Sequence, residues 1–203
     1  MTASASESNS PSPGGTRRRG EVLRKAILDA ALEELRTVGY ARLSMDSVAA
    51  AAGTGKAALY RRWANRDELV ADALRSALPD PAEIELTGDP RTDLLALVTC
   101  VRDAIRLSYG EVFRAVRGEA TAAQGMVHSL FGDRVMTPCH ELTLQVLREG
   151  VAAGQLRAEA VNDRVATVGP AMVIHAVITG RPRLSDRYLA AVVDDVILPL
   201  VSR

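Results

Sequence analysis

The chain has few aromatic residues, only two cysteines and no long apolar run. Phe, Trp and Tyr make up 3% of the 203 residues, whereas hydrophobic residues as a class make up 47%, a balance that favours helices over sheets. Cys100 and Cys139 form no Cys-x-x-Cys or Cys/His pattern, so we expect two buried thiols in a reducing cytoplasm. No apolar run approaches the ~20 residues that a membrane-spanning helix needs. These scarcities predict a soluble, cytoplasmic, all-α protein.

The net charge is zero, but the charges are unevenly distributed along the chain. Residues 17–66 hold 11 Lys/Arg against 5 Asp/Glu, and residues 79–203 hold 13 against 16. A cationic first part on an acidic remainder predicts that only the first part meets a polyanion.

Local composition divides the chain into three parts. Residues 1–16 are mostly Ser, Pro, Gly and Ala, which cannot bury enough apolar surface to offset the entropy of ordering, so we expect a disordered arm. Prolines and glycines between positions 79 and 90 mark a polar connector. We therefore predict one domain over residues 17–78 and a second over residues 79–203.

Apolar residues recur every three or four positions in both domains, which is the period of an amphipathic helix. Ser44 and Asn65 are suited to cap the helices that follow them, and Gly53 allows a turn between two short helices. We expect about nine helices, one of them interrupted near Gly132 and Pro138. They cover approximately residues 20–38, 44–52, 54–62, 65–78, 93–107, 111–123, 127–152, 162–179 and 185–201.

The most informative stretch is residues 43–63, which reads as two short helices broken by a glycine. This is the layout of a helix-turn-helix, in which one helix holds a second in the major groove of DNA. Leu59 and Trp63 lie four positions apart on one face of the second helix, so we expect them to anchor it. The remaining positions should then face DNA, and they include Lys56, Tyr60 and Arg61 or Arg62.

The exposed residues of this second helix have distinct chemistry. A lysine near the helix N-terminus, such as Lys56, can reach O6 or N7 of guanine. The hydroxyl of Tyr60 suits a phosphate, a contact that fixes register without reading sequence. Arg17, Arg18 and Arg19 could reach a neighbouring groove, or they could be a plain solvated tail.

Residues 21–78 resemble the N-terminal DNA-binding domain of the TetR family of one-component bacterial regulators. The matching positions are Gly39-Tyr40, Leu43-Ser44-Met45, Val48-Ala49, Ala52-Gly53, Lys56, Leu59-Tyr60, Trp63 and Asn65-Arg66-Asp67-Glu68-Leu69. The resemblance implies base or backbone contacts to DNA at Thr54, Gly55, Lys56 and Ala57, and phosphate contacts at Ser44, Tyr60 and Arg66. Two positions depart from the family pattern: Ala58 stands where a hydroxyl residue is common, and Arg62 where a histidine is frequent.

The same residues contain a second, competing motif. Gly53-Thr54-Gly55-Lys56 resembles the end of the phosphate-binding P-loop of an NTPase, which needs a glycine five residues before Gly55 and a serine or threonine after the lysine. This chain has Ala50 and Ala57 there, so a magnesium ligand is missing. No Ser/His/Asp, paired-carboxylate, metal-ligand or cofactor motif stands out elsewhere. We therefore expect no enzymatic activity, no metal and no cofactor.

The resemblance also implies that the second domain binds a small molecule and forms a homodimer through its last two helices. The terminal helix supports the dimer independently, because its broad apolar face needs an internal partner or a second subunit. That face comprises Leu189, Val192, Val193, Val196, Ile197, Leu200 and Val201. The residues predicted to line a ligand cavity are Tyr109, Phe113, Met126, His128, Phe131, His140, Met172 and His175.

The sequence therefore predicts a sequence-specific, DNA-binding transcriptional regulator. We expect a repressor that binds a palindromic operator as a dimer and is released by a small-molecule ligand, with an activator open within the same class. The alternative is a helical ligand-binding or protein-interaction module that does not read DNA specifically, which the missing hydroxyl at Ala58 favours.

Overall fold

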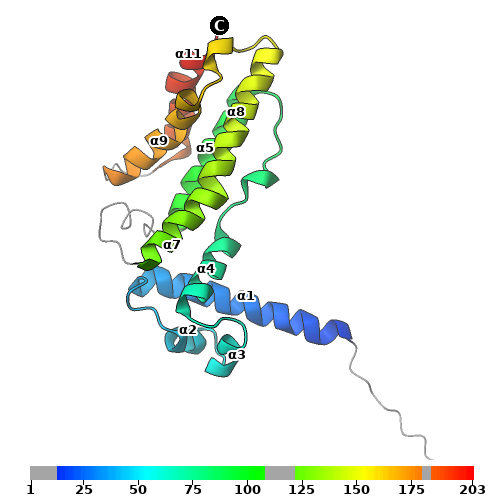
Figure 1. Ribbon diagram of the computed structural model, residues 1–203, viewed down its shortest axis with the longest axis vertical. Helices are drawn as coiled ribbons and strands as arrows, with labels where there is room; N and C mark the ends of the chain where they lie inside the picture. The colour runs from blue at the N-terminus through cyan, green and yellow to red at the C-terminus, as the bar shows by residue number, and fades with distance from the viewer. Residues whose placement is uncertain (1–12, 108–121, 180–183) are drawn as a thin grey trace, which may run out of the picture. The chain divides into compact units, whose positions relative to one another are not determined.

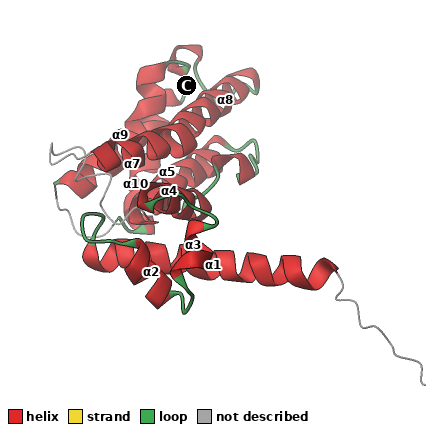
Figure 2. Ribbon diagram, turned by 60° about the horizontal axis from the view of Figure 1, so that its bottom comes forward, coloured by secondary structure: helices red, strands yellow, loops and turns green. Residues whose placement is uncertain are grey.

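The computed structural model describes residues 13–107, 122–179 and 184–203, and every regular element in these ranges is a helix (Figures 1 and 2). The all-α prediction is therefore confirmed. The chain divides into two compact units, residues 1–73 and 74–203, and the boundary falls inside helix α4 (Arg66–Ala77). Among the described helices, none combines the length and the apolar character that crossing a membrane requires.

The first unit contains α1 (Pro13–Val38), α2 (Met45–Ala51), α3 (Lys56–Tyr60) and most of α4. Because α1 begins at Pro13, residues 13–16 are helical and do not belong to the arm predicted over residues 1–16. Proline is favourable at a first helical position, since its ring fixes φ near the helical value. Residues 1–12 of the predicted arm lie outside the described residues.

Local sequence signals set the turns of this unit. The Ser44 hydroxyl accepts a hydrogen bond of 3.0 Å from the Ser47 N–H, and the Ser47 hydroxyl accepts one of 3.2 Å from the Ser44 N–H. This reciprocal capping box begins α2. Gly53 has a φ of 61° between α2 and α3, a conformation that residues with a side chain disfavour. Asn65 caps α4 through a 2.9 Å bond from the Glu68 N–H. The two predicted caps and the predicted turn are confirmed.

The four helices of the first unit enclose an apolar core. Helices of seven and five residues, such as α2 and α3, are marginal in isolation, so their stability comes from this packing. The core residues are Ile27, Leu28, Ala31, Leu35, Tyr40, Leu43, Met45, Val48, Ala49, Leu59, Trp63, Leu69, Val70, Ala71 and Ala73.

Two helices of the second unit pass through π-helical segments. The first path runs from α7 through a π segment into α8, and the second runs from α10 through another into α11; we call the second path the terminal helix. Helices α5, α8 and α9 lie side by side (Figure 1). The elements are a 3-10 turn (Pro81–Glu83), α5 (Pro90–Leu107), α7 (Ala122–Phe131), π segment Gly132–Met136, α8 (Thr137–Ala152), a 3-10 turn (Ala158–Ala160), α9 (Asp163–Ile178), α10 (Asp186–Ala191), π segment Val192–Ile197 and α11 (Leu198–Val201).

The described residues thus form eight continuous helices. The predicted helix over residues 111–123 falls almost entirely within 108–121, outside the described residues. The predicted interruption near Gly132 and Pro138 is a change of helix type and not a break, because a π segment runs from Gly132 to Met136 and Pro138 lies in the first turn of α8 that follows it. Asn162 and Ser185 cap α9 and the terminal helix through their side chains, so both helices begin where the sequence predicted.

Close contacts join α9 and the terminal helix to α5. A Cβ atom at Gly169 would lie 2.7 Å from Val98 Cγ1 and 3.0 Å from Ile197 Cδ1, so any side chain there would push α9 away from its neighbours. The Arg91 guanidinium on α5 donates two hydrogen bonds of 2.7 Å to Asp194 on the terminal helix. These contacts fix three helices around one apolar interior.

Candidate nucleic-acid interface and apolar pocket

Helix α3 has one face that is buried and anchors it and one face that is exposed. Leu59 is fully buried and Trp63, just beyond the helix, is 5% exposed, whereas Tyr60 is 55% exposed. Lys56 and Ala57 are exposed on the first turn. The structure confirms Leu59 and Trp63 as packing residues and places Lys56 and Tyr60 on the surface, as the helix-turn-helix interpretation requires.

Asp72 links α4 both to α1 and to Trp63, the residue just beyond α3. Its carboxylate accepts a hydrogen bond of 3.0 Å from Trp63 Nε1 and two of 2.9 Å from the guanidinium of Arg24 on α1. Asp72 therefore helps to set the orientation of the exposed face of α3. Sequence reasoning found Trp63 but missed Asp72, because no local spacing indicates which distant carboxylate receives the indole N–H.

Arg66 is held by the chain segment that precedes α2. Its guanidinium lies 4.5 Å from the centre of the Tyr40 ring and donates a 3.1 Å hydrogen bond to the Leu43 carbonyl. The same guanidinium nitrogen also donates a 3.4 Å hydrogen bond to the Tyr40 carbonyl. A guanidinium has five N–H donors, so the phosphate contact predicted for Arg66 would use the donors that these two carbonyls do not occupy. The contact itself stays a prediction.

The Tyr40 hydroxyl donates a hydrogen bond to the Asp67 carboxylate on α4. Burial of the phenol, together with this hydrogen bond, raises the pKa of Tyr40 to about 12. The folded first unit therefore keeps the Tyr40 hydroxyl protonated and hydrogen-bonded to Asp67.

We expect the first unit to lose stability between about pH 10 and pH 12. The folded state holds the Tyr40 proton up to about pH 12, whereas the unfolded chain releases it near the ordinary tyrosine pKa of 10.0. The stabilising contribution is complete below pH 10 and is lost as the pH rises through 12. In urea unfolding followed by Trp63 fluorescence, Tyr40→Phe should remove this part of the pH dependence. An unchanged pH dependence in Tyr40→Phe would contradict the assignment to Tyr40.

The other predicted DNA-contacting cations differ in their partners. The Lys56 ammonium donates a hydrogen bond to the Asp46 carboxylate in the first turn of α2. Arg62 Nη2 donates a 3.2 Å hydrogen bond to the Gly20 carbonyl of α1. The Arg61 side chain is exposed and makes no hydrogen bond or ion pair with the described residues. The structure describes only the backbone of Arg17, Arg18 and Arg19, which belongs to α1.

The small predicted contact residues lie at the starts of α2 and α3. Ser44 is exposed, and its hydroxyl caps α2. Gly55 is exposed and is the N-cap of α3, without a side-chain hydrogen bond, and Thr54 is half-buried in the turn before it. The Asp46–Lys56 contact shows that the first turns of α2 and α3 are adjacent. The predicted residues near these two turns therefore share one part of the surface.

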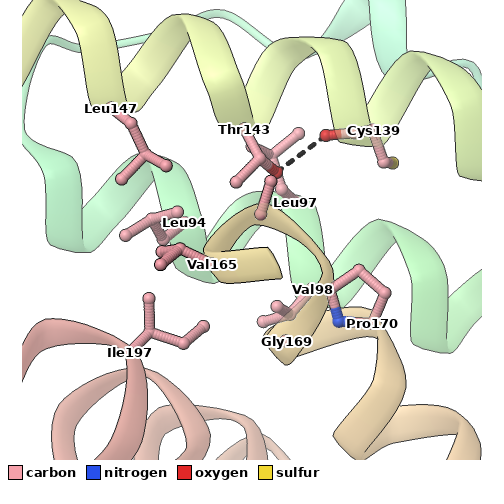
Figure 3. A pocket seen from close by; sticks show the side chains of 11 residues that line it. Leu94, Leu97, Val98, Cys139, Thr143, Leu147, Val165, Gly169, Pro170 and Ile197 are labelled. Atoms are coloured by element: carbon pink, nitrogen blue, oxygen red, sulfur yellow. Dashed lines mark hydrogen bonds between the residues drawn. The ribbon is translucent and has the colours of Figure 1, made fainter. Parts of the chain in front are cut away.

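The second unit contains an apolar pocket between α5, α8, α9 and the terminal helix (Figure 3). Thr143 is the one hydroxyl residue of its lining, and that hydroxyl donates to the Cys139 carbonyl at 2.7 Å. The cavity volume is about 10 Å³, which is room for about one water molecule. It is lined by Leu94, Leu97, Val98, Cys139, Thr143, Leu147, Val165, Ala166, Gly169, Pro170 and Ile197.

Among the described residues predicted for a ligand cavity, none lines this pocket. The prediction selected aromatic, histidine and methionine side chains, whereas the pocket is lined almost entirely by aliphatic ones. His128 and His175 are exposed, His140 and Met172 are half-buried, and Phe131 is buried. Tyr109, Phe113 and the side chain of Met126 lie outside the described residues.

Cys100 of α5 and Cys139 of α8 are free and buried, as the sequence predicted. A hydrogen bond between the two thiols, together with burial, raises the pKa of Cys139 far above its usual range. The described part of the chain contains no group of three or more His, Cys, Asp or Glu residues arranged to hold a metal ion.

The chain matches two protein-family models. Residues 27–73 match the model described as "Bacterial regulatory proteins, tetR family", and residues 84–196 match "Tetracyclin repressor-like, C-terminal domain". The second match alone extends over more than half of the chain.

Similar proteins are known from several bacteria. The chain is 33% identical over 190 residues to the DNA-binding transcriptional repressor TetR of Mycobacteroides abscessus, covering 90% of this chain and 96% of that protein. It is 29% identical over 204 residues to an HTH-type transcriptional regulator of Mycobacterium tuberculosis, covering 100% of this chain and 96% of that protein. A solved structure of a transcriptional regulator from Saccharomonospora viridis in complex with choline shares the fold, with a TM-score of 0.68, 18% identity, and coverage of 90% of this chain and 99% of that one.

Proposed function

The chain belongs to the tetR family of bacterial regulatory proteins and is a DNA-binding transcriptional regulator, and we propose that it represses transcription by occupying a palindromic operator as a homodimer until a small molecule releases it. The exposed face of α3 carries this proposal, because Lys56 and Tyr60 face outward while Leu59 and Trp63 hold the helix in place. We assign DNA binding to residues 17–78, and ligand binding and dimerisation to residues 79–203. No catalytic role is proposed for any residue.

We assign the DNA contacts by the chemistry of each exposed group. Lys56 would donate to a guanine edge, and the Tyr60 hydroxyl would donate to a phosphate. Arg61 and Arg62 would contribute further phosphate contacts, because both are exposed beside Tyr60. The family resemblance adds Ser44, Thr54, Gly55, Ala57 and Arg66.

The proposed dimer contact lies on α9 and the terminal helix. Five residues of the predicted apolar face, namely Leu189, Val192, Val193, Ile197 and Val201, are buried within the chain itself and so already have an internal partner. Leu200 on α11 is 38% exposed and Ile178 on α9 is 41% exposed. We place both at the contact between subunits, since large apolar side chains on the surface favour a partner.

We propose the apolar pocket as the effector site. Among the described residues its lining holds no charged or aromatic side chain, and the one hydroxyl among them is already hydrogen-bonded. An uncharged aliphatic ligand would suit it, and entry of anything larger than a water molecule would have to separate the surrounding helices. The choline bound to the S. viridis protein is a quaternary ammonium, which is typically recognised by aromatic faces, so we expect this chain to take a different class of ligand.

The DNA-binding proposal is tested with a duplex from the region upstream of the protein's own gene. Fluorescence anisotropy should show tighter binding to a duplex from this region than to a random duplex of equal length. A protein that makes about 6–10 phosphate contacts loses roughly 10³–10⁵ in affinity between 50 and 200 mM salt, and we expect a loss of that order. Equal affinity for both duplexes would reject sequence-specific reading and favour an interaction module.

A further inference from the structure

The cation that begins α3 is paired with a carboxylate from α2. Lys56 Nζ donates to Asp46 Oδ2, and the two side chains are 62% and 58% exposed. Asp46 lies in the first turn of α2, and Lys56 is the first residue of α3. The residue that we assign to a guanine edge therefore has an acidic partner on the same surface before DNA arrives.

The position of Asp46 is favourable for its own helix, whereas that of Lys56 is not. Negative charge near a helix N-terminus interacts well with the helix dipole, and positive charge there interacts poorly. Helix α3 also lacks a side-chain cap, because its N-cap is Gly55. The Asp46 carboxylate offsets the Lys56 charge at this end. Since an exposed ion pair contributes little to stability, it can open without disturbing the fold.

We propose that Asp46 is a specificity-determining residue that holds Lys56 away from the phosphates of non-operator DNA. The inference rests on the proposed function. On a random duplex, Lys56 would exchange the Asp46 carboxylate for a phosphate, one anion for another, and Asp46 would repel the DNA backbone. On the operator, Lys56 would keep one N–H donor on Asp46 and direct the other two to O6 and N7 of a guanine, a bidentate contact that discriminates between bases and leaves the pair closed.

Asp46 therefore weakens binding to random DNA more than binding to the operator. Specificity is a difference between two affinities, and a repulsive group that penalises the wrong partner increases it. The Lys56 side chain alone would increase the affinity for any duplex, because phosphate contacts carry no sequence information. The Asp46–Lys56 pair makes the contribution of Lys56 conditional on sequence.

The experiment compares Asp46→Asn with a matched control, Asp29→Asn. Asp29 on α1 is equally exposed, at 58%, and pairs with Lys25, so its substitution removes the same charge from the same unit. The probes are a duplex obtained by in vitro selection with the wild-type protein and a random duplex of the same length. Asp46→Asn should increase the affinity for the random duplex about 3–10-fold. It should also steepen the fall of log affinity with log salt concentration by about one released counterion. The affinity for the selected duplex should change less, so the ratio of the selected-duplex affinity to the random-duplex affinity falls. Asp29→Asn should leave this ratio unchanged.

Four results would overturn the proposal. Asp46→Asn could leave the ratio unchanged, or it could weaken only the selected duplex, which would indicate that Asp46 contacts a base directly. The same gain for the random duplex in Asp46→Asn combined with Lys56→Ala would show that charge alone acts, without the ion pair. Equal binding of both duplexes by the wild type would reject the proposed function and the selectivity with it, whereas intact wild-type selectivity with an unchanged ratio in Asp46→Asn would reject Asp46 alone.

Discussion

Replacing Trp63 by alanine should strongly destabilise the first compact unit and abolish DNA binding. Trp63 is 5% exposed within the core, and its indole N–H donates to Asp72. Truncation of a buried tryptophan costs about 3–5 kcal/mol, whereas the whole stability of a domain is about 5–15 kcal/mol. Since α3 has only five residues, it cannot persist once its anchor is removed.

The matched variant is Trp63→Phe, which keeps most of the ring but loses the hydrogen bond to Asp72. Its cost should be smaller, about 1.5–3 kcal/mol for a hydrogen bond to a charged group, because Asp72 keeps Arg24 as its partner. Urea unfolding followed by circular dichroism measures both variants. The chain has a single tryptophan, so wild-type fluorescence reports the first unit selectively. A Trp63→Ala variant within about 1 kcal/mol of the wild type would refute the anchoring role, given the cost expected for a buried tryptophan.

Four helix starts could be predicted from sequence because a cap is a local interaction. Ser44, Asn65, Asn162 and Ser185 each accept a hydrogen bond from an N–H three residues later. The start of α1 was predicted too late, since Pro13 begins a helix in a segment whose composition indicated disorder. Composition describes the average tendency of a segment and does not show where a neighbouring helix stops extending into it.

The candidate site could be predicted only where periodicity determines it. The division of α3 into a buried Leu59 and an exposed Tyr60 follows from the period of a helix and is confirmed. Asp72 and Asp46 were missed, because their partners come from other helices and no local spacing identifies them. The pocket was missed for a different reason. Its lining consists of core-type aliphatic residues from α5, α8, α9 and the terminal helix, and in the sequence such residues cannot be distinguished from ordinary core.

Replacing Leu200 by glutamate should convert the proposed dimer into a monomer. Leu200 is 38% exposed on α11. A two-fold interface brings the same surface of both subunits together, so two added carboxylates would enter one contact. Burying unpaired charges in this way is strongly unfavourable. Light scattering at micromolar concentration should show a dimer for the wild type and a monomer for Leu200→Glu. A monomeric wild type, or a dimeric Leu200→Glu, would contradict the proposed contact.

Loss of the dimer should weaken operator binding far more than loss of any single DNA contact. Joining two binding modules increases the overall affinity about 10²–10⁴-fold without a new contact, and a monomer forfeits that gain. Leu200→Glu should therefore lower operator affinity by about two orders of magnitude or more. Gln145→Glu is the matched control, because Gln145 is exposed on α8 and gains the same charge outside the proposed contact. It should keep both the dimeric mass and the wild-type affinity. An equal loss in both variants would assign the effect to overall charge, since added negative charge anywhere on the protein repels DNA.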